Sequence, residues 1–137
     1  MREEALNRLQ PISRPHPPIL LGGEGERKTM RFVAQYADAC NFNAGIGLDG
    51  LRHKLQVLQH HCLALGRRYE EIERTALGEV DLRLDAMSIQ DVVKMCRQLA
   101  ESGVQHLILN VAELHTLRPL ELLGSEVIPA VAKFGDS

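Results

Sequence analysis

Hydrophobic and polar positions follow two different periods, which alternate along the chain. Short apolar runs of the kind that form buried strands occur at residues 19–21, 39–42 and 107–111. Between them, apolar side chains recur every three to four positions, which predicts amphipathic helices over residues 26–37, 49–65 and 89–102. A last helix is predicted from Pro119 onward, where the proline suits the first turn and Pro129 predicts a bend or an interruption.

Each predicted helix has one apolar face that we expect to be buried. The four faces are Met30, Val33, Ala34 and Ala37; Leu51, Leu55, Leu58, Cys62 and Leu65; Ile89, Val92, Val93, Cys96, Leu99 and Ala100; and Leu120, Leu123, Val127, Val131 and Phe134. Ser88 and Asp91 have the spacing of a capping box, and Gly66 and Gly103 suit the residue after a helix C-terminus. These signals predict where the second and third helices end and where the third begins.

The pattern of residues 74–84 predicts one more strand, which has an apolar and a charged face. Apolar and charged side chains alternate there with a period of two: Val80, Leu82 and Leu84 against Asp81, Arg83 and Asp85. The element order is then β-α-β-α-β-α-β-α, which predicts a parallel sheet covered by helices. An open doubly wound sheet and part of a (β/α)8 barrel both fit this order.

The length of the chain favours the barrel. A complete barrel has eight βα units and about 250 residues, whereas this chain has 137 residues and four predicted units. We therefore expect residues 19–137 to form half of a barrel, after a proline-rich lead-in over residues 1–18. Half a barrel leaves two open strand edges and an exposed apolar inner face, so we expect a homo-oligomer or a partner chain that completes it.

Composition and charge exclude several classes of protein. Hydrophobic residues make up 45% and charged residues 25%, which is a globular mixture. The net charge of −2 and 4% aromatic content argue against a nucleic-acid partner. No apolar run reaches the roughly 18 residues that cross a bilayer, and charged residues follow Met1, so we expect neither membrane association nor a signal peptide. Cys40, Cys62 and Cys96 form no paired motif, which favours reduced thiols in a cytoplasmic protein.

The segment after the first predicted strand is the strongest candidate for a binding site. Gly22, Gly23 and Gly25 precede a helix and let backbone amides approach an anion, and the helix N-terminus adds about half a positive charge. Lys28 and Thr29 can add a charge and a hydroxyl. The segment matches the dinucleotide and ATP phosphate-loop motifs only in part, with Lys28 and Arg27 at positions where glycine is required. Spacing alone leaves phosphate binding and a purely structural tight turn both open.

Two other clusters carry potential chemistry. Neighbouring residues on a helix diverge by about 100°, so His53, His60, His61 and Cys62 favour a solvated helix face over a metal site, and we expect no metal. Glu79, Asp81 and Asp85 could supply paired carboxylates at a barrel mouth. A solvated edge of the sheet is the simpler interpretation of these acidic residues.

Four segments together resemble the luciferase-like F420- and flavin-dependent oxidoreductases. They are Pro-Pro-Ile-Leu-Leu-Gly-Gly-x-Gly-Glu-x-Lys-Thr-x-Arg-x-Val-Ala-x-Tyr-Ala-Asp-Ala-Cys-Asn-Phe at residues 17–42, the helix that contains Leu51-Arg-His-Lys-Leu, Gly-Val-Gln-His-Leu-Ile-Leu-Asn at residues 103–110, and Leu-Leu-Gly-Ser-Glu-Val-Ile-Pro-Ala-Val at residues 122–131. The resemblance runs from about Glu4 onward, in order and with similar spacing.

The resemblance implies the carboxy-terminal half of a luciferase-like (β/α)8 barrel. The loop after the first of these strands resembles the loop that anchors the cofactor phosphate in the family. The resemblance assigns this role to Gly22, Gly23, Glu24 and Gly25, and more weakly to Lys28 and Thr29. The implied cofactor is F420, with FMN as the alternative, for hydride transfer or monooxygenation of a small organic substrate.

No catalytic residue is carried over from the family. The family's first four strands supply most of the pocket for the cofactor ring and most of the catalytic residues, and nothing in these 137 residues resembles them. We therefore expect a truncated member of the family. The alternative is a non-enzymatic half-barrel that associates with itself or with a separate first half.

Overall fold

The computed structural model describes residues 12, 15–23, 25–83 and 86–134. Within these residues, four strands form one parallel sheet: β1 (Leu20–Gly22), β2 (Ala39–Asn43), β3 (Glu73–Val80) and β4 (His106–Val111). They pair in sequence order, β1-β2-β3-β4. Consecutive strands of a barrel pair in this way, whereas a doubly wound sheet reverses its strand order at a switch point. The observed order therefore supports the half-barrel over the doubly wound sheet.

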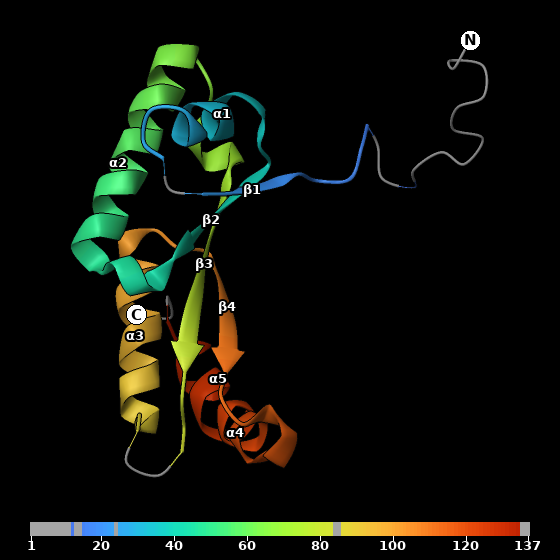
Figure 1. The fold of residues 1–137 in the computed structure, drawn as a ribbon, viewed down its shortest axis with the longest axis vertical. Helices are drawn as coiled ribbons and strands as arrows, with labels where there is room; N and C mark the ends of the chain where they lie inside the picture. Colours follow the sequence, from blue (N-terminus) through green and yellow to red (C-terminus); the bar gives the residue numbers. More distant parts are fainter. Residues whose placement is uncertain (1–11, 13–14, 24, 84–85, 135–137) are drawn as a thin grey trace.

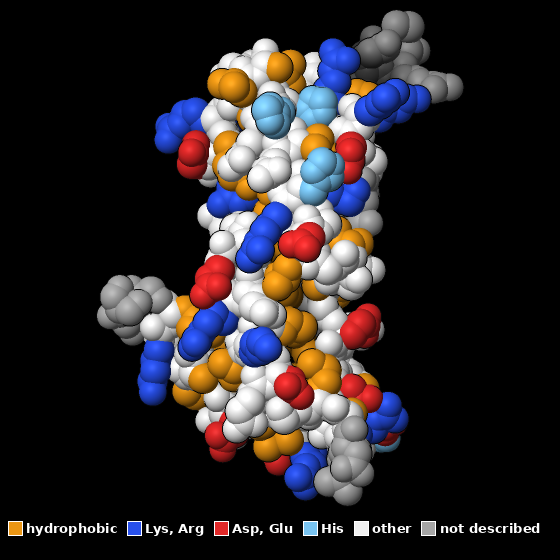
Figure 2. Space-filling model, turned by 90° about the vertical axis from the view of Figure 1, so that its left-hand side faces the viewer, with side chains coloured by type: hydrophobic (Ala, Val, Ile, Leu, Met, Phe, Trp, Pro, Cys, Tyr) orange, Lys and Arg blue, Asp and Glu red, His pale blue; other side chains and the backbone are white. Residues whose placement is uncertain are grey.

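Helices connect the strands and cover one face of the sheet. They are α1 (Thr29–Tyr36), α2 (Leu48–Leu65), α3 (Ile89–Ser102), α4 (Arg118–Leu122) and α5 (Ile128–Val131). In Figure 1, α2 and α3 lie along the same side of the sheet. Their outer surface carries a mixture of basic and acidic side chains, with histidines gathered toward one end (Figure 2). None of the described helices is both long enough and apolar enough to span a membrane.

Two apolar clusters hold the helices on the sheet. The larger one joins β2 and β3 to α1 and α2, and its largest fully buried side chains are Phe42, Met30, Leu51 and Leu58. The smaller one joins the ends of β3 and β4 to α3 and the C-terminal helices, through Val80, Val92, Cys96, Val111, Leu123 and Val127. Most of the predicted helix faces are thus confirmed. Leu65, at 42% exposed, and Ala100 and Leu120, which are also exposed, do not belong to them.

The last helix is interrupted as its second proline predicts. Pro119 lies in the first turn of α4, and Pro129 lies in the first turn of α5. A π-helical turn, Leu123–Val127, joins the two. Proline has no backbone N–H to donate, so the regular hydrogen-bond ladder cannot run through it.

Two elements differ from the prediction by three or more residues at one end, and the other predicted boundaries of the strands and of the first three helices are within one residue. The third strand, β3, begins one residue before the predicted start and ends at Val80. The alternation at residues 81–83 therefore belongs to a loop. Leu84 and Asp85 lie outside the described residues. The loop keeps the alternation because Leu82 packs on the smaller apolar cluster while Asp81 pairs with Arg83. The first helix begins at Thr29 and not at residue 26, because residues 26–28 form a turn.

The predicted capping box at the start of α3 is confirmed. The Asp91 amide donates to Ser88 Oγ, and the Ser88 amide donates to Asp91 Oδ2, both at 3.0 Å. The hydrogen bonds from Ser88 hold the pKa of the Asp91 carboxyl below its usual value. That carboxylate therefore stabilises the fold above the unfolded-state pKa, and its contribution is lost as the pH falls through the folded-state pKa.

Replacing the capping serine should measurably destabilise the protein. We expect Ser88→Ala to lower the free energy of unfolding by about 1 kcal/mol, because one amide of the first turn of α3 loses its acceptor. Urea denaturation at neutral pH measures the change. Ser102→Ala is the matched control in the last turn of the same helix, where the hydroxyl only donates back to the Gln98 carbonyl, and it should cost less than about 0.5 kcal/mol. Equal losses in the two variants would contradict the capping role.

Candidate functional site

The carboxyl ends of the four strands define one edge of the sheet. In parallel α/β barrels the loops at this edge build the binding site. Here these loops follow Gly22, Asn43, Val80 and Val111. The predicted glycine segment is the first of them, so the structure places it at the edge where a ligand is expected.

The β1–α1 loop is shaped around the side chain of Thr29. Gly23 has a φ of +127°, a conformation that side chains strongly disfavour. A Cβ atom added to Gly25 would lie 2.9 Å from Thr29 Oγ1, and one added to Gly23 would lie 3.1 Å from Thr29 Cγ2. Both glycines are therefore required by the fold of the loop, and they leave its backbone open. Glu24, the fourth predicted member, lies outside the described residues.

The start of α1 offers backbone donors and positive charge. The N-cap residue Lys28 makes no side-chain hydrogen bond to the first turn, and the Met30 amide reaches back to the Gly25 carbonyl at 3.0 Å. The exposed side chains of Arg27, Lys28 and Arg31 surround this helix end. A helix N-terminus without an acidic cap and with basic neighbours favours an anion.

A face of α2 holds the loop from the other side. The His53 ring lies 3.1 Å from the Glu26 carboxylate, and Lys54 Nζ lies 3.9 Å from the same oxygen. His61 Nε2 lies 3.0 Å from the Glu26 backbone carbonyl, which accepts the hydrogen bond. The sequence interpretation of these histidines as a merely solvated face was therefore incomplete, because two of them fix the loop. Within the described ranges, no group of three or more His, Cys, Asp or Glu side chains is placed to hold a metal ion.

The loops after β3 and β4 are less suited to an anion. Arg83 is held by both carboxylate oxygens of Asp81, at 2.9 and 3.0 Å, and lies 3.6 Å from Glu113. The hydrogen bonds from Arg83 hold the pKa of Asp81 below its usual value. The guanidinium of Arg83 is thus already neutralised by the side chains of Asp81 and Glu113. The β1–α1 loop instead carries the exposed basic side chains of Arg27 and Lys28 beside a single described acidic residue, Glu26.

The predicted acidic group is not brought together. Glu79 lies on β3, whereas Asp81 lies beyond the end of that strand and pairs with Arg83. Asp85 is outside the described residues. Among the described residues of this group, Asp81 therefore pairs with Arg83 and Glu79 with Asn110, and not with each other.

The face of the sheet opposite the helices is largely polar, so the expectation of an apolar inner face was wrong. The strand registers align Asn41 with Thr75 and His106, Asn43 with Leu77 and Ile108, and Glu79 with Asn110. In a barrel this face lines the interior. The signal was present in the sequence, because polar residues occupy alternate positions within strands that are otherwise apolar.

Hydrogen bonds connect these polar side chains across neighbouring strands. Thr75 Oγ1 lies 2.7 Å from Asn41 Oδ1 and donates to the Cys40 carbonyl at 2.8 Å. Asn110 Nδ2 donates to Glu79 at 3.0 Å. These contacts order the inner face as a polar surface, of the kind that orients a ligand within a barrel.

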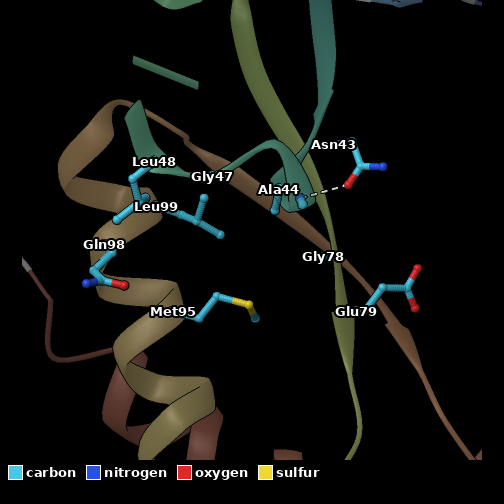
Figure 3. Close-up of a pocket in the computed structure, with 10 residues that line it drawn as sticks. Asn43, Ala44, Gly47, Leu48, Gly78, Glu79, Met95, Gln98 and Leu99 are labelled. Atoms are coloured by element: carbon cyan, nitrogen blue, oxygen red, sulfur yellow. Dashed lines mark hydrogen bonds between the residues drawn. The ribbon is translucent and has the colours of Figure 1, made fainter. Parts of the chain in front are cut away.

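Apart from the β1–α1 loop, a hollow lies beside the β2–α2 loop (Figure 3). It has a volume of about 290 Å³ and is lined by Asn43, Ala44, Gly45, Gly47, Leu48, Gly78, Glu79, Met95, Gln98 and Leu99. Asn43 and Glu79 point away from Met95 and α3, toward the inner face. Asn43 Oδ1 accepts from the Gly45 amide at 2.8 Å, so its side chain fixes the turn that leads into α2. The hollow shares no residue with the β1–α1 loop.

The three cysteines are free and buried, as small apolar side chains are. Burial raises the pKa of Cys40 to about 12, although Arg74 opposes the shift, and it also raises the pKa of Cys62 and Cys96. At pH 8, roughly one Cys40 thiol in ten thousand is then a thiolate, the form that reacts with disulfide reagents.

We expect Cys40 to stay unreactive in the native protein. In a Cys62→Ser/Cys96→Ser variant, an aromatic disulfide reagent should release no chromophore at pH 8 until urea unfolds the chain. The measurement compares the rate at which this single thiol reacts with the reagent in the native protein and in urea. A fast, stoichiometric reaction in the folded protein would contradict the burial of Cys40.

Comparison with solved structures supports the fold. The coenzyme F420-dependent tetrahydromethanopterin reductase from Methanopyrus kandleri matches with a TM-score of 0.63 and 14% identity, over 82% of this chain and 50% of the reductase chain. DmoA from Hyphomicrobium sulfonivorans matches with a TM-score of 0.65 and 13% identity, over 90% of this chain and 44% of that protein. No protein-family model and no curated protein matches the chain.

These matches define the class of fold. The chain has the fold of one half of a luciferase-like (β/α)8 barrel. It spans about half the length of the two solved structures. The predicted fold class is therefore confirmed.

Proposed function

We propose that this chain is the cofactor-phosphate half of a luciferase-like oxidoreductase. The observation that carries the proposal is the β1–α1 loop, with its two required glycines and its basic surroundings, at the carboxyl edge of a half-barrel. The barrel fold and the residue resemblance support an oxidoreductase. F420 is the favoured cofactor, because one structural neighbour is an F420-dependent reductase. FMN is the alternative.

The residues of the loop fit a phosphate group. A Cβ atom at Gly23 or Gly25 would occupy the space beside Thr29, so the glycines keep the backbone accessible. The amides of Gly22, Gly23 and Gly25 and of Thr29 at the start of α1 would donate to phosphate oxygens, with the Thr29 hydroxyl beside them. The Met30 amide is already bonded to the Gly25 carbonyl. Glu24 belongs to the same proposal through its amide. Lys28 would add charge at the surface.

A bound F420 or FMN would supply the hydride or oxygen chemistry. This chain's own residues would hold the phosphate at the rim and present the polar inner face around Thr75 and Glu79 to the barrel interior. The substrate is a small organic molecule. Its binding residues and the catalytic residues are proposed to come largely from the other half of the barrel.

A second candidate function is an assembly module without activity of its own. Exposed apolar side chains at both ends of the sheet favour it, since Leu20 is 48% exposed on β1 and Ile108 is 42% exposed on β4. In this case the chain would supply half of the barrel and no cofactor site.

A cofactor titration separates the two candidates. The purified chain is titrated with F420 and, in parallel, with FMN, and binding is followed by the fluorescence of the cofactor. The proposed function predicts saturable binding of at least one of them. Absence of binding of either cofactor at high micromolar concentration would contradict a cofactor site in this chain and leave the assembly module.

A further inference from the structure

An apolar groove lies along the C-terminal helices. It has a volume of about 490 Å³ and lies between α4, α5 and the β4–α3 layer, where it is lined mainly by Leu107, Leu109, Leu120, Leu123, Val127 and Ile128. Leu120 is 48% exposed and Ile128 is 62% exposed. Exposed apolar surface that is this continuous marks an interaction site.

A matching apolar surface lies at the other end of the sheet. On α1, the rings of Phe32 and Tyr36 stack with their centroids 6.3 Å apart, yet the two residues are 50% and 63% exposed. Exposed aromatic pairs are enriched at protein interfaces because they bury a large area with few rotatable bonds. The groove is large enough to receive both rings.

The charges on the two surfaces are complementary. Between Leu120 and Ile128 the charged side chains are Glu121 and Glu126, both exposed. On α1, the charged side chain is Arg31, and the turn before it holds Arg27, Lys28 and Glu26. The Glu26 carboxylate lies 3.1 Å from His53 of α2, which leaves the two basic residues to set the charge of this end of α1. Arg118 and Lys133 lie outside this stretch of the C-terminal helices. Opposite charges beside the two surfaces favour a contact between α1 and the groove, whereas like charges disfavour the contact of either surface with its own copy.

The topology allows two equivalent contacts in a dimer, each between α1 of one copy and the groove of the other. β1 and β4 are the two edges of one all-parallel sheet, with α1 following β1 and α4 following β4. In a second copy related by a twofold axis along the barrel, β4 of each copy would lie beside β1 of the other, and the C-terminal helices would lie beside the other copy's α1. This arrangement closes with two copies and leaves no free edge.

We propose that the occupant of the groove is a second copy of this chain, which inserts Phe32 and Tyr36 of its α1 between the C-terminal helices and β4. Two four-strand halves then complete an eight-strand barrel, which is consistent with this chain spanning about half of its structural neighbours. The pairing also covers the exposed apolar side chains Leu20 and Ile108 of the inner face. This inference does not depend on cofactor binding.

Sedimentation or light scattering of the 137-residue chain tests the proposal. The expected mass at micromolar concentration is about twice 15.3 kDa. We expect Phe32→Glu and Ile128→Lys each to weaken the dimer at least tenfold, because each places a charge in the apolar contact. Leu63→Glu is the matched control on α2, where Leu63 is 81% exposed outside both surfaces, and it should leave the dimer intact.

Mixing the two variants provides the decisive comparison. In a mixed dimer one of the two contacts is entirely wild-type, and the other brings a glutamate to a lysine, so mixing should restore dimers that neither variant forms alone. If circular dichroism shows that either variant is unfolded, Tyr36→Glu and Leu120→Lys replace them. A monomer at high micromolar concentration, an open-ended oligomer, or variants that dimerise as well as the control would each overturn the proposal.

Discussion

Replacing Gly23 with aspartate is expected to lower the affinity of the chain for F420 and FMN at least tenfold. A side chain at a φ of +127° strains the loop, and its Cβ would press on Thr29 Cγ2 at 3.1 Å. A carboxylate a few ångströms from a phosphate adds roughly 1–4 kcal/mol of repulsion near a protein surface. Both effects act directly at the proposed phosphate site.

The control for this variant is Leu63→Asp, which adds the same charge to an exposed position on α2. Cofactor fluorescence titrations measure both affinities, and circular dichroism confirms that each variant is folded. The account predicts wild-type affinity for Leu63→Asp. A Gly23→Asp variant that binds as tightly as the wild-type chain would remove the loop from the proposed site.

Phe42→Ala is expected to cause the largest loss of stability, about 3–5 kcal/mol. The Phe42 side chain is fully buried in the cluster that joins β2 and β3 to α1 and α2. Truncation removes its buried area and leaves a cavity that the surrounding strands and helices cannot fill. Because domains of this size are stable by only about 5–15 kcal/mol, the loss is a large share of the total.

Urea denaturation measures this loss. Phe42→Leu should recover more than half of it, since leucine refills most of the volume. Leu63→Ala, at an exposed position, should change the free energy of unfolding by less than about 0.5 kcal/mol. A Phe42→Ala variant as stable as the Leu63→Ala control would contradict the position of Phe42 in the core.

Local signals predicted the helices that carry their own boundaries. The α3 helix begins at the Ser88–Asp91 capping box and ends at Gly103, which has a φ of +110°. The α2 helix likewise ends before Gly66. These caps depend on side chains within a few residues of each other, so the sequence specifies them without knowledge of the tertiary fold.

Boundaries that depend on distant contacts were predicted less well. β3 ends at Val80 because its partner strand β4 ends at Val111, and the register pairs these two residues. The alternating pattern continues beyond Val80 for another reason, since Leu82 packs on the smaller apolar cluster. Periodicity cannot distinguish a paired strand from an extended loop with one buried side.

The candidate site was predicted in part. The glycine segment could be found because a strand, glycines and a helix follow one another within about ten residues. Its attachment to α2 through Glu26, His53 and His61 joins residues about 27 to 35 positions apart, so no local motif reveals it. The polar inner face could be found from the polar residues at alternate positions of its strands, but which of them lie side by side follows only from the strand register.

In the proposed function, the β1–α1 loop binds the phosphate of the cofactor. The most direct test compares FMN with riboflavin, and F420 with its phosphate-free deazaflavin, in titrations of the wild-type chain and the Gly23→Asp variant. We predict that at least one phosphorylated cofactor binds the wild-type chain at least tenfold more tightly than its phosphate-free form, and that this preference disappears in the variant. Equal affinities of the wild-type chain for the two forms of both cofactors would contradict the account.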